Sequence, residues 1–251
     1  MKTSELWDEL KPFALRDIGD VLSARKQIAS SEDRTNILLY SASTDKVRSY
    51  TADEDGLRGA VGAAEDNDIV VIPPVTIALT QTLTAAKKIA IVGVLSDARV
   101  TSYAHKTRIA NAADTGARLV YLSGFVSLYN LDVSYTANTS TSRAAITAAG
   151  SQNALYNCRI SCQNTGGDAA GINVHYTIFV DNCIIYANST SGYGHGMVGA
   201  SPGTNVYTRD SEYYGYGGGG GTGIAIKDGV IYNCNVTGTT IGLSVGFVGG
   251  G

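Results

Sequence analysis

The feature that most constrains this chain of 251 residues is a repeat in its second half. Each repeat is anchored by Asn or Asp inside a short apolar run, and the anchors are spaced by 27, 25, 28 and 23 residues: Asn130, Asn157, Asn182, Asp210 and Asn233. A second apolar series follows at spacings of 26, 25, 27 and 19 residues: Ile146, Ile172, Met197, Ile224 and Leu243. Two series that share one period in the twenties, built from strand-like units, indicate a solenoid.

Alternation within each unit predicts how the rungs stack. In a strand, Cys158 and Ile160 lie on one face and Asn157 and Arg159 on the other. Stacking then aligns one inward ladder of small residues, which comprises Leu131, Cys158, Cys183, Ser211 and Cys234. The asparagines are expected to form a second, structural ladder at a bend, where each amide bonds the backbone of its neighbour. About five to seven rungs are expected from this repeat.

Composition excludes several classes of function. The 19 Lys and Arg against 22 Asp and Glu give a net charge of −3, which does not favour nucleic-acid binding. No apolar run approaches the roughly 18 residues of a membrane span. The N-terminus leads from Met1 and Lys2 into Glu5, Asp8 and Glu9, which is unlike a signal peptide. We therefore expect synthesis in a cytoplasm, no nucleic-acid partner and no membrane span.

The first part of the chain differs in kind from the repeats. Apolar residues recur near helical spacing in residues 1–30, namely Leu6, Leu10, Phe13, Ala14, Ile18, Val21 and Leu22. Pro12 is expected in the first turn of a second helix. This amphipathic segment would pack on the main domain or on sister chains, for attachment or oligomerisation. Residues 31–55 read as a β-hairpin linker, and residues 56–251 as a parallel β-helix capped by a helix at 56–65.

The order of elements after residue 55 resembles a known family. A helix is followed by an apolar strand ending at Pro73 and Pro74, a short strand, and a Lys-led strand ending at Gly93. This order is similar to the N-terminal cap and first rungs of the pectin-lyase-like superfamily, over residues 55–246. The resemblance implies an all-β fold, a right-handed single-stranded parallel β-helix behind a short N-terminal helical segment and a β-hairpin. It implies no single activity, because this fold carries many.

The four cysteines are explained by packing. Cys158, Cys183 and Cys234 share one repeat position, as packing residues in a stack do. Cys158 and Cys162 have a spacing that zinc sites use, but no second close pair of Cys or His completes such a site. Disulfides are disfavoured without an export signal. We therefore expect no metal and no cofactor.

One group of segments resembles family-28 polygalacturonases. These segments are Asp181-Asn182-Cys183, Gly194-His195-Gly196-Met197 and Gly223–Lys227. Inverting glycosidases need two carboxyl groups on opposite sides of the scissile bond. Here the second acidic residue is replaced by Asn182, and Ala225 stands where the family has Arg.

The weak catalytic candidates that remain are Asp181, His195, Asp210, Glu212 and Lys227. Asp210 and Glu212 are expected on the same side of one strand, near enough to act as a pair. For both, a solvated outer face is the default alternative.

Tyrosines supply the candidate ligand site. Tyr213, Tyr214 and Tyr216 stand beside the run Gly217–Gly221, which reads as a loop, and His195 is a fourth candidate for this site. Flat amphipathic rings suit sugars and equally suit a packed contact with a neighbouring chain.

A small β-helix behind a helical and hairpin N-terminus resembles bacteriophage tailspikes, tail fibres and head fibres. That resemblance implies a virion structural protein that forms a homotrimer. Residues 1–55 would attach it to other virion proteins, and its β-helix would contact host-surface polysaccharide. The alternative is a polysaccharide-degrading hydrolase or lyase on the same fold. A cellular adhesin is a third class, which the missing signal peptide disfavours. If the protein acts on glycans, we expect binding rather than cleavage, because a complete acid and base pair is missing from the motifs.

Overall fold

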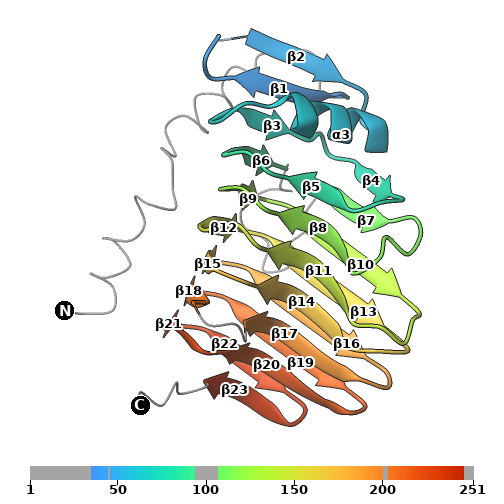
Figure 1. Ribbon diagram of the computed structural model, residues 1–251, viewed down its shortest axis with the longest axis vertical. Helices are drawn as coiled ribbons and strands as arrows, with labels where there is room; N and C mark the ends of the chain where they lie inside the picture. The colour runs from blue at the N-terminus through green and yellow to red at the C-terminus, as the bar shows by residue number, and fades with distance from the viewer. Residues whose placement is uncertain (1–34, 45, 94–106, 200–202, 246–251) are drawn as a thin grey trace, which may run out of the picture.

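The computed structural model describes residues 35–44, 46–93, 107–199 and 203–245. Over these ranges the chain is a β-solenoid, built from parallel sheets and one short helix (Figure 1). The all-β parallel solenoid predicted from the repeat is therefore confirmed. The amphipathic segment expected over 1–30 lies outside the described residues.

Three sheets run the length of the solenoid. Sheet A has nine strands, in the spatial order β2 (Lys46–Tyr50), β1 (Ile37–Ser41), β3 (Ile69–Val71), β6 (Ala90–Val92), β9 (Ser127–Tyr129), β12 (Asn153–Tyr156), β15 (Thr177–Asp181), β18 (Asn205–Arg209) and β21 (Asp228–Tyr232). Sheet B has seven, from β4 (Thr76–Leu79) through β7 (Arg108–Asn111), β10 (Asp132–Ala137), β13 (Arg159–Asn164), β16 (Ile184–Ser189) and β19 (Glu212–Gly217) to β22 (Asn235–Gly238). Sheet C has seven, from β5 (Leu83–Ala85) through β8 (Arg118–Leu122), β11 (Arg143–Ala148), β14 (Ala169–Val174), β17 (Tyr193–Gly199) and β20 (Gly220–Ile226) to β23 (Ile241–Val245).

The chain visits sheets A, B and C in turn, so that one coil is three strands. Seven such coils follow one another from β3–β4–β5 to β21–β22–β23. Each strand pairs in parallel with its counterpart one coil away, as Leu155 of β12 pairs with Leu128 of β9 and Val180 of β15. The pairing offsets of 27 and 25 residues are the spacings of the sequence repeat, because the repeat unit is the coil.

A β-hairpin and a helix close the N-terminal end of the solenoid. β1 and β2 form the antiparallel hairpin expected over 31–55, and β1 also pairs antiparallel with β3. The hairpin is thus part of sheet A. The expected capping helix is α3 (Glu54–Ala63), which begins two residues early because the Asp53 side chain accepts a hydrogen bond from the backbone N–H of Gly56 at 2.8 Å. Leu57, Ala60 and Val61 of α3 are buried and cover the end of the core.

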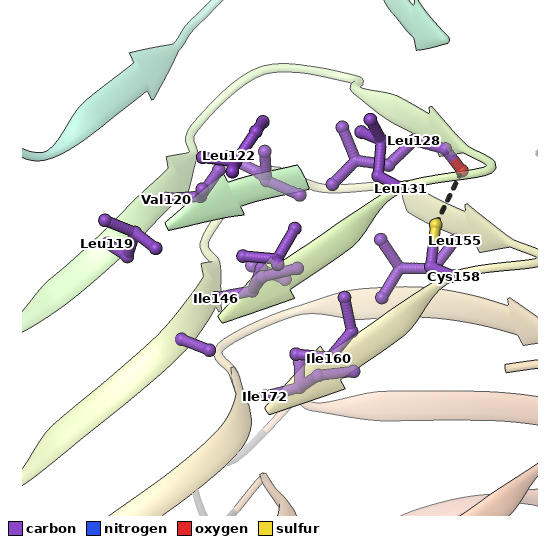
Figure 2. Packing of buried hydrophobic residues seen from close by; sticks show 14 of the residues in the cluster. Leu119, Val120, Leu122, Leu128, Leu131, Ile146, Leu155, Cys158, Ile160 and Ile172 are labelled. Atoms are coloured by element: carbon purple, nitrogen blue, oxygen red, sulfur yellow. Dashed lines mark hydrogen bonds between the residues drawn. The ribbon is translucent and has the colours of Figure 1, made fainter. Parts of the chain in front are cut away.

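The core is one continuous stack between the three sheets. Figure 2 shows part of it, where Leu128 and Leu155 of sheet A face Ile160 of sheet B and Ile146 and Ile172 of sheet C. All five side chains are at most 1% exposed. The alternation predicted from the repeat thus places an apolar side chain at the same inward position of successive coils.

Sheets B and C come into backbone contact in the later coils. A Cβ atom placed on Gly194 would lie 1.8 Å from the carbonyl oxygen of Tyr216, and one on Gly215 would lie 2.0 Å from that of Thr222. Side chains cannot fit at that separation, which accounts for glycine at both positions. The run expected as a five-glycine loop is therefore mostly strand, with only Gly218 and Gly219 between β19 and β20.

Candidate functional site

The asparagine anchors of the repeat form the corner between sheets A and B. Each follows a sheet A strand and adopts a left-handed backbone with φ between 48° and 58°, and the set comprises Asn130, Asn157, Asn182, Asp210 and Asn233. Asn and Asp tolerate this conformation better than other residues that carry a side chain. The repeat therefore marks the turn that lets the chain pass from sheet A to sheet B.

The side chains at this corner bond one another along the solenoid. The Asn157 amide nitrogen donates to Asn130 Oδ1 at 3.4 Å, and that of Asn182 donates to Asn157 Oδ1 at 2.5 Å. Asn233 donates to Asp210 Oδ1 at 2.5 Å. The sequence predicted a ladder bonded to backbone, whereas these contacts join side chain to side chain.

The residues after the anchors form the predicted inward stack. Cys158 and Cys183 are fully buried, and Ser211 is 1% exposed. The stack is hydrogen-bonded along its length: the Cys158 N–H donates to Cys183 Sγ at 3.4 Å, and the Cys183 N–H donates to Ser211 Oγ at 3.1 Å. Cys234 lies in the last described coil and is half-buried. Burial raises the pKa of Cys183 well above its ordinary value, so this thiol is a packing group rather than a nucleophile.

Asp181 is held in an ion pair. It ends β15 on the outer face of sheet A, where its Oδ2 lies 2.6 Å from Nη2 of Arg209 on the next coil. Arg209 Nε also lies 3.3 Å from Asp210 Oδ2. Both oxygens of the Asp181 carboxylate thus lie within hydrogen-bonding distance of the Arg209 guanidinium, in a contact that joins two neighbouring coils.

Asp210 and Glu212 do not form the expected pair on one strand. Asp210 lies in the corner, with φ of 50°, and bonds Asn233. Glu212 is the first residue of β19 and accepts a hydrogen bond from the Tyr214 hydroxyl at 2.8 Å. That hydrogen bond, with burial in addition, raises the pKa of Tyr214. The left-handed turn at Asp210 thus interrupts the single strand that alternation assumed, and the two carboxylates have different hydrogen-bond partners.

Lys227 and His195 lie elsewhere in the solenoid. Lys227 precedes β21 at the corner between sheets C and A, whereas Asp181 and Arg209 end their strands at the A–B corner. His195 lies on the outer face of β17, stacked on Tyr193 with ring centroids 6.2 Å apart. Its Nδ1 is buried and has no hydrogen-bond partner, and burial lowers its pKa. The segments Gly194–Met197 and Gly223–Lys227 thus run along neighbouring strands of sheet C, whereas Asp181-Asn182-Cys183 lies at the corner between sheets A and B.

Tyr213 does not lie on the outer surface of sheet B with Tyr214 and Tyr216. Its side chain is fully buried in the core, and its hydroxyl lies 2.6 Å from Thr208 Oγ1. Burial raises its pKa well above the ordinary value. The repeat held the signal for this correction, because Tyr213 is three residues after its anchor, the position of the inward Ile160 and Ile185.

Tyr214 and Tyr216 do share a surface, and Tyr186 joins them. All three are half-buried on the outer face of sheet B. The Tyr214 and Tyr216 rings are 6.4 Å apart and nearly parallel, and Tyr186 on β16 lies 5.7 Å from Tyr216 at an angle of 47°. Tyr186 was missed from the sequence, although it occupies the repeat position of Tyr214 one coil earlier. We call these three residues the tyrosine platform.

His195 does not belong to this platform. A Cβ atom on Gly196, the next residue, would point inward to within 3.2 Å of the Tyr214 backbone nitrogen. The inner faces of β17 and β19 therefore oppose each other, and the outer faces that carry His195 and the platform point away from one another. Of the four candidate ligand residues, Tyr214 and Tyr216 therefore share one outer surface with Tyr186, whereas Tyr213 and His195 do not lie on it.

The described residues contain no group of three His, Cys, Asp or Glu side chains placed to hold a metal ion. Among them, no helix is long and apolar enough to cross a membrane.

Comparisons with known proteins give little further guidance. No protein-family model matches the chain, and no curated protein matches it. A solved structure that resembles it is ORF18 of Geobacillus virus E2, with a TM-score of 0.39 and 11% sequence identity. The match covers 72% of this chain and 44% of that one, so this chain spans less than half of that protein's length. At this TM-score the likeness has no bearing on function.

Proposed function

We propose that this chain is a virion structural protein, a tail spike or fibre or a capsid-attached decoration protein whose solenoid projects from the particle. The observation that carries the proposal is a seven-coil parallel solenoid that has a tyrosine platform on its outer face. In the same solenoid, the candidate acids are engaged in structural contacts. In the pectin-lyase-like and tailspike proteins that the sequence resembles, this architecture serves both binding and catalysis. Here the engaged acids favour binding.

The solenoid suits a projecting element for a mechanical reason. Each inner coil is hydrogen-bonded to two neighbours through three sheets, and the core runs unbroken between them. Bending such a stack requires many backbone hydrogen bonds and core contacts to yield together. A protein that must keep a surface at a distance from its anchorage benefits from that stiffness.

The tyrosine platform suits a neutral sugar ring. Tyrosine presents a flat apolar face for the C–H groups of a sugar and a hydroxyl for its polar edge. The Tyr214 hydroxyl is already oriented by Glu212, which lowers the entropy lost on binding. Asn188 is paired in register with Tyr216 and adds an amide on the same outer row. We therefore propose host-surface polysaccharide as the ligand.

Attachment to other virion proteins would use residues 1–55. Within the described part, β2 is the edge strand of sheet A, and its residues from Lys46 to Ser49 are exposed. We propose that the exposed residues Lys46, Val47 and Arg48 contact such a partner. We further propose that the assembled protein is a homotrimer, which light scattering of the full-length chain would test; a monomer at micromolar concentration would contradict it.

The decisive experiment incubates the protein with a panel of bacterial surface polysaccharides and follows both binding and chain length. Binding without shortening is expected, and Tyr214→Ala or Tyr216→Ala should abolish it. Tyr193→Ala is the matched control, because Tyr193 is 54% exposed on sheet C. Shortened chains that persist in Tyr214→Ala but vanish in Glu212→Gln would replace adhesion by the polysaccharide-degrading alternative. Virion location is tested separately, by counting copies per purified particle.

A further inference from the structure

The outer face of sheet B carries its charged side chains in one row, formed by the first residue of successive strands. Parallel pairing from β7 to β19 places these residues side by side: Arg108, Asp132, Arg159, Ile184 and Glu212. We call them the charged row. Two arginines and one aspartate make the end over β7, β10 and β13 positive, whereas Glu212 makes the end over β19 negative. The two ends of the row therefore attract ligand groups of opposite charge.

Arg159 is the residue of the charged row that is best placed to meet an anion. It is exposed at the start of β13, and no hydrogen bond or ion pair joins its guanidinium to another of the described residues. Arg108, by contrast, donates a hydrogen bond to the Ser134 hydroxyl at 2.9 Å. Asp132 pairs in register with both arginines, so one carboxylate lies beside two guanidinium groups. The positive charge is thus only partly compensated here.

The tyrosine platform adjoins Arg159. In sheet B, β16 lies between β13 and β19, and Tyr186 is two residues beyond Ile184, the register partner of Arg159. One strand spacing of about 4.8 Å and two residues of about 3.3 Å each put the α-carbons of Arg159 and Tyr186 about 8 Å apart. Both side chains lie on the outer face. A sugar stacked on Tyr186 would therefore have the next sugar of its chain within reach of the guanidinium.

Uncharged polar groups complete the surface between these two residues. Ser161 pairs in register with Tyr186, and Gln163 pairs with Asn188. Their hydroxyl and amide groups can bond sugar hydroxyls. At the other end of the platform, Glu212 accepts a hydrogen bond from the Tyr214 hydroxyl and would repel an anion. An anionic group on the ligand is thus favoured over β13 and disfavoured over β19.

We propose that the ligand of the tyrosine platform is an anionic polysaccharide, in which an uncharged sugar stacks on the platform and the adjacent charged sugar binds Arg159. The anion is a carboxylate or a phosphate, because a planar guanidinium donates two parallel hydrogen bonds to either group. The glycan lies with its charged unit toward the N-terminal coils. This inference rests on the proposed function, since it names the ligand class of the same site.

Binding of matched charged and uncharged polymers tests the inference. The probes are gellan and hyaluronan, in which glucuronate adjoins uncharged sugars, the same two polymers with their carboxyl groups reduced to alcohols, and a capsular polysaccharide with phosphodiester links. At low ionic strength, an anionic polymer should bind about three- to tenfold more tightly than uncharged forms. Arg159→Gln should remove this difference and leave binding of the reduced polymers unchanged.

Two further variants identify the guanidinium as the cause. Arg48→Gln is the matched control, because Arg48 is an exposed arginine on β2, and it should keep the full preference for anionic polymers. Arg159→Lys keeps the charge but loses the two-point hydrogen bonding, so its preference should lie between those of wild type and Arg159→Gln. Raising the ionic strength from about 0.01 M to about 1 M should abolish the preference in wild type, because the charges are exposed and become screened.

The outcomes separate this inference from the proposed function. If anionic and reduced polymers bind equally well and Tyr214→Ala removes both, the platform binds glycans but the anionic class is wrong. A preference for anions that survives in Arg159→Gln would also overturn the inference. If no polymer of the panel binds, charged or uncharged, the result contradicts both the inference and glycan binding by the platform.

Discussion

Substitutions of Asn182 would separate the two roles of the corner residues. Its backbone has φ of 52°, and its amide donates a hydrogen bond to Asn157. Alanine removes the hydrogen bond, which contributes about 0.5–1.5 kcal/mol of stability. In addition, the left-handed backbone conformation costs an alanine about 1–2 kcal/mol. Glycine removes the same hydrogen bond but adopts the conformation freely. We expect Asn182→Ala to lose about 2 kcal/mol of unfolding free energy and Asn182→Gly about 1 kcal/mol.

Thermal unfolding followed by circular dichroism measures this difference. For a chain of this size, about 2 kcal/mol corresponds to a fall of about 4–8 °C in Tm, and about 1 kcal/mol to about 2–4 °C. Asn188→Ala is the control, because Asn188 lies on the outer face of β16 in ordinary strand conformation, and it should change stability by less than about 0.5 kcal/mol. If Asn182→Gly proves as unstable as Asn182→Ala, the left-handed backbone is not what selects asparagine at this corner.

Three further predictions concern the core, the contact between sheets and the N-terminal cap. Cys234 should react with Ellman's reagent before the other three cysteines, which are buried and should react only on unfolding; equal rates in the folded protein would contradict the stack. Gly194→Ala should prevent folding or cost more than about 3 kcal/mol, since its Cβ would meet backbone at 1.8 Å, whereas Gly62→Ala in α3 has open space and should be neutral or stabilising in the same melts. Burial alone would raise the pKa of Glu54, but hydrogen bonds from Arg58 and Thr80 outweigh it and lower that pKa to about 2. The stability contributed by Glu54 is thus present above its ordinary pKa of 4.5 and is lost as the pH falls toward 2; Glu54→Gln should flatten this part of a curve of Tm against pH, and an unchanged curve would contradict the pairing.

The architecture could be predicted from the sequence because the length of one coil of a solenoid appears in the sequence as a repeat. Each coil places the same side chain at the same point, so the spacing of Asn157 and Asn182 is the length of a coil. The left-handed corner also leaves a local signal, since few residues other than glycine tolerate it. The cysteine stack followed from the same register. Even the burial of Tyr213 was implied there, although its ring chemistry suggested a ligand site.

The tertiary structure alone decided which outer surfaces belong together. Alternation states that His195 and Tyr214 both point outward, but not that the sheets carrying them face opposite ways. From composition alone the glycine-rich tract is interpreted as a loop, because composition does not show which strands lie close together. The structure shows instead that glycine is needed where β19 approaches β20. The partners of Asp181 and Glu212 were equally hidden, since ion pairs and hydrogen bonds depend on distances between coils and around a corner. The sequence period determines which residues stack along the axis of a solenoid. Only the folded structure determines which residues of different sheets come into contact across a coil.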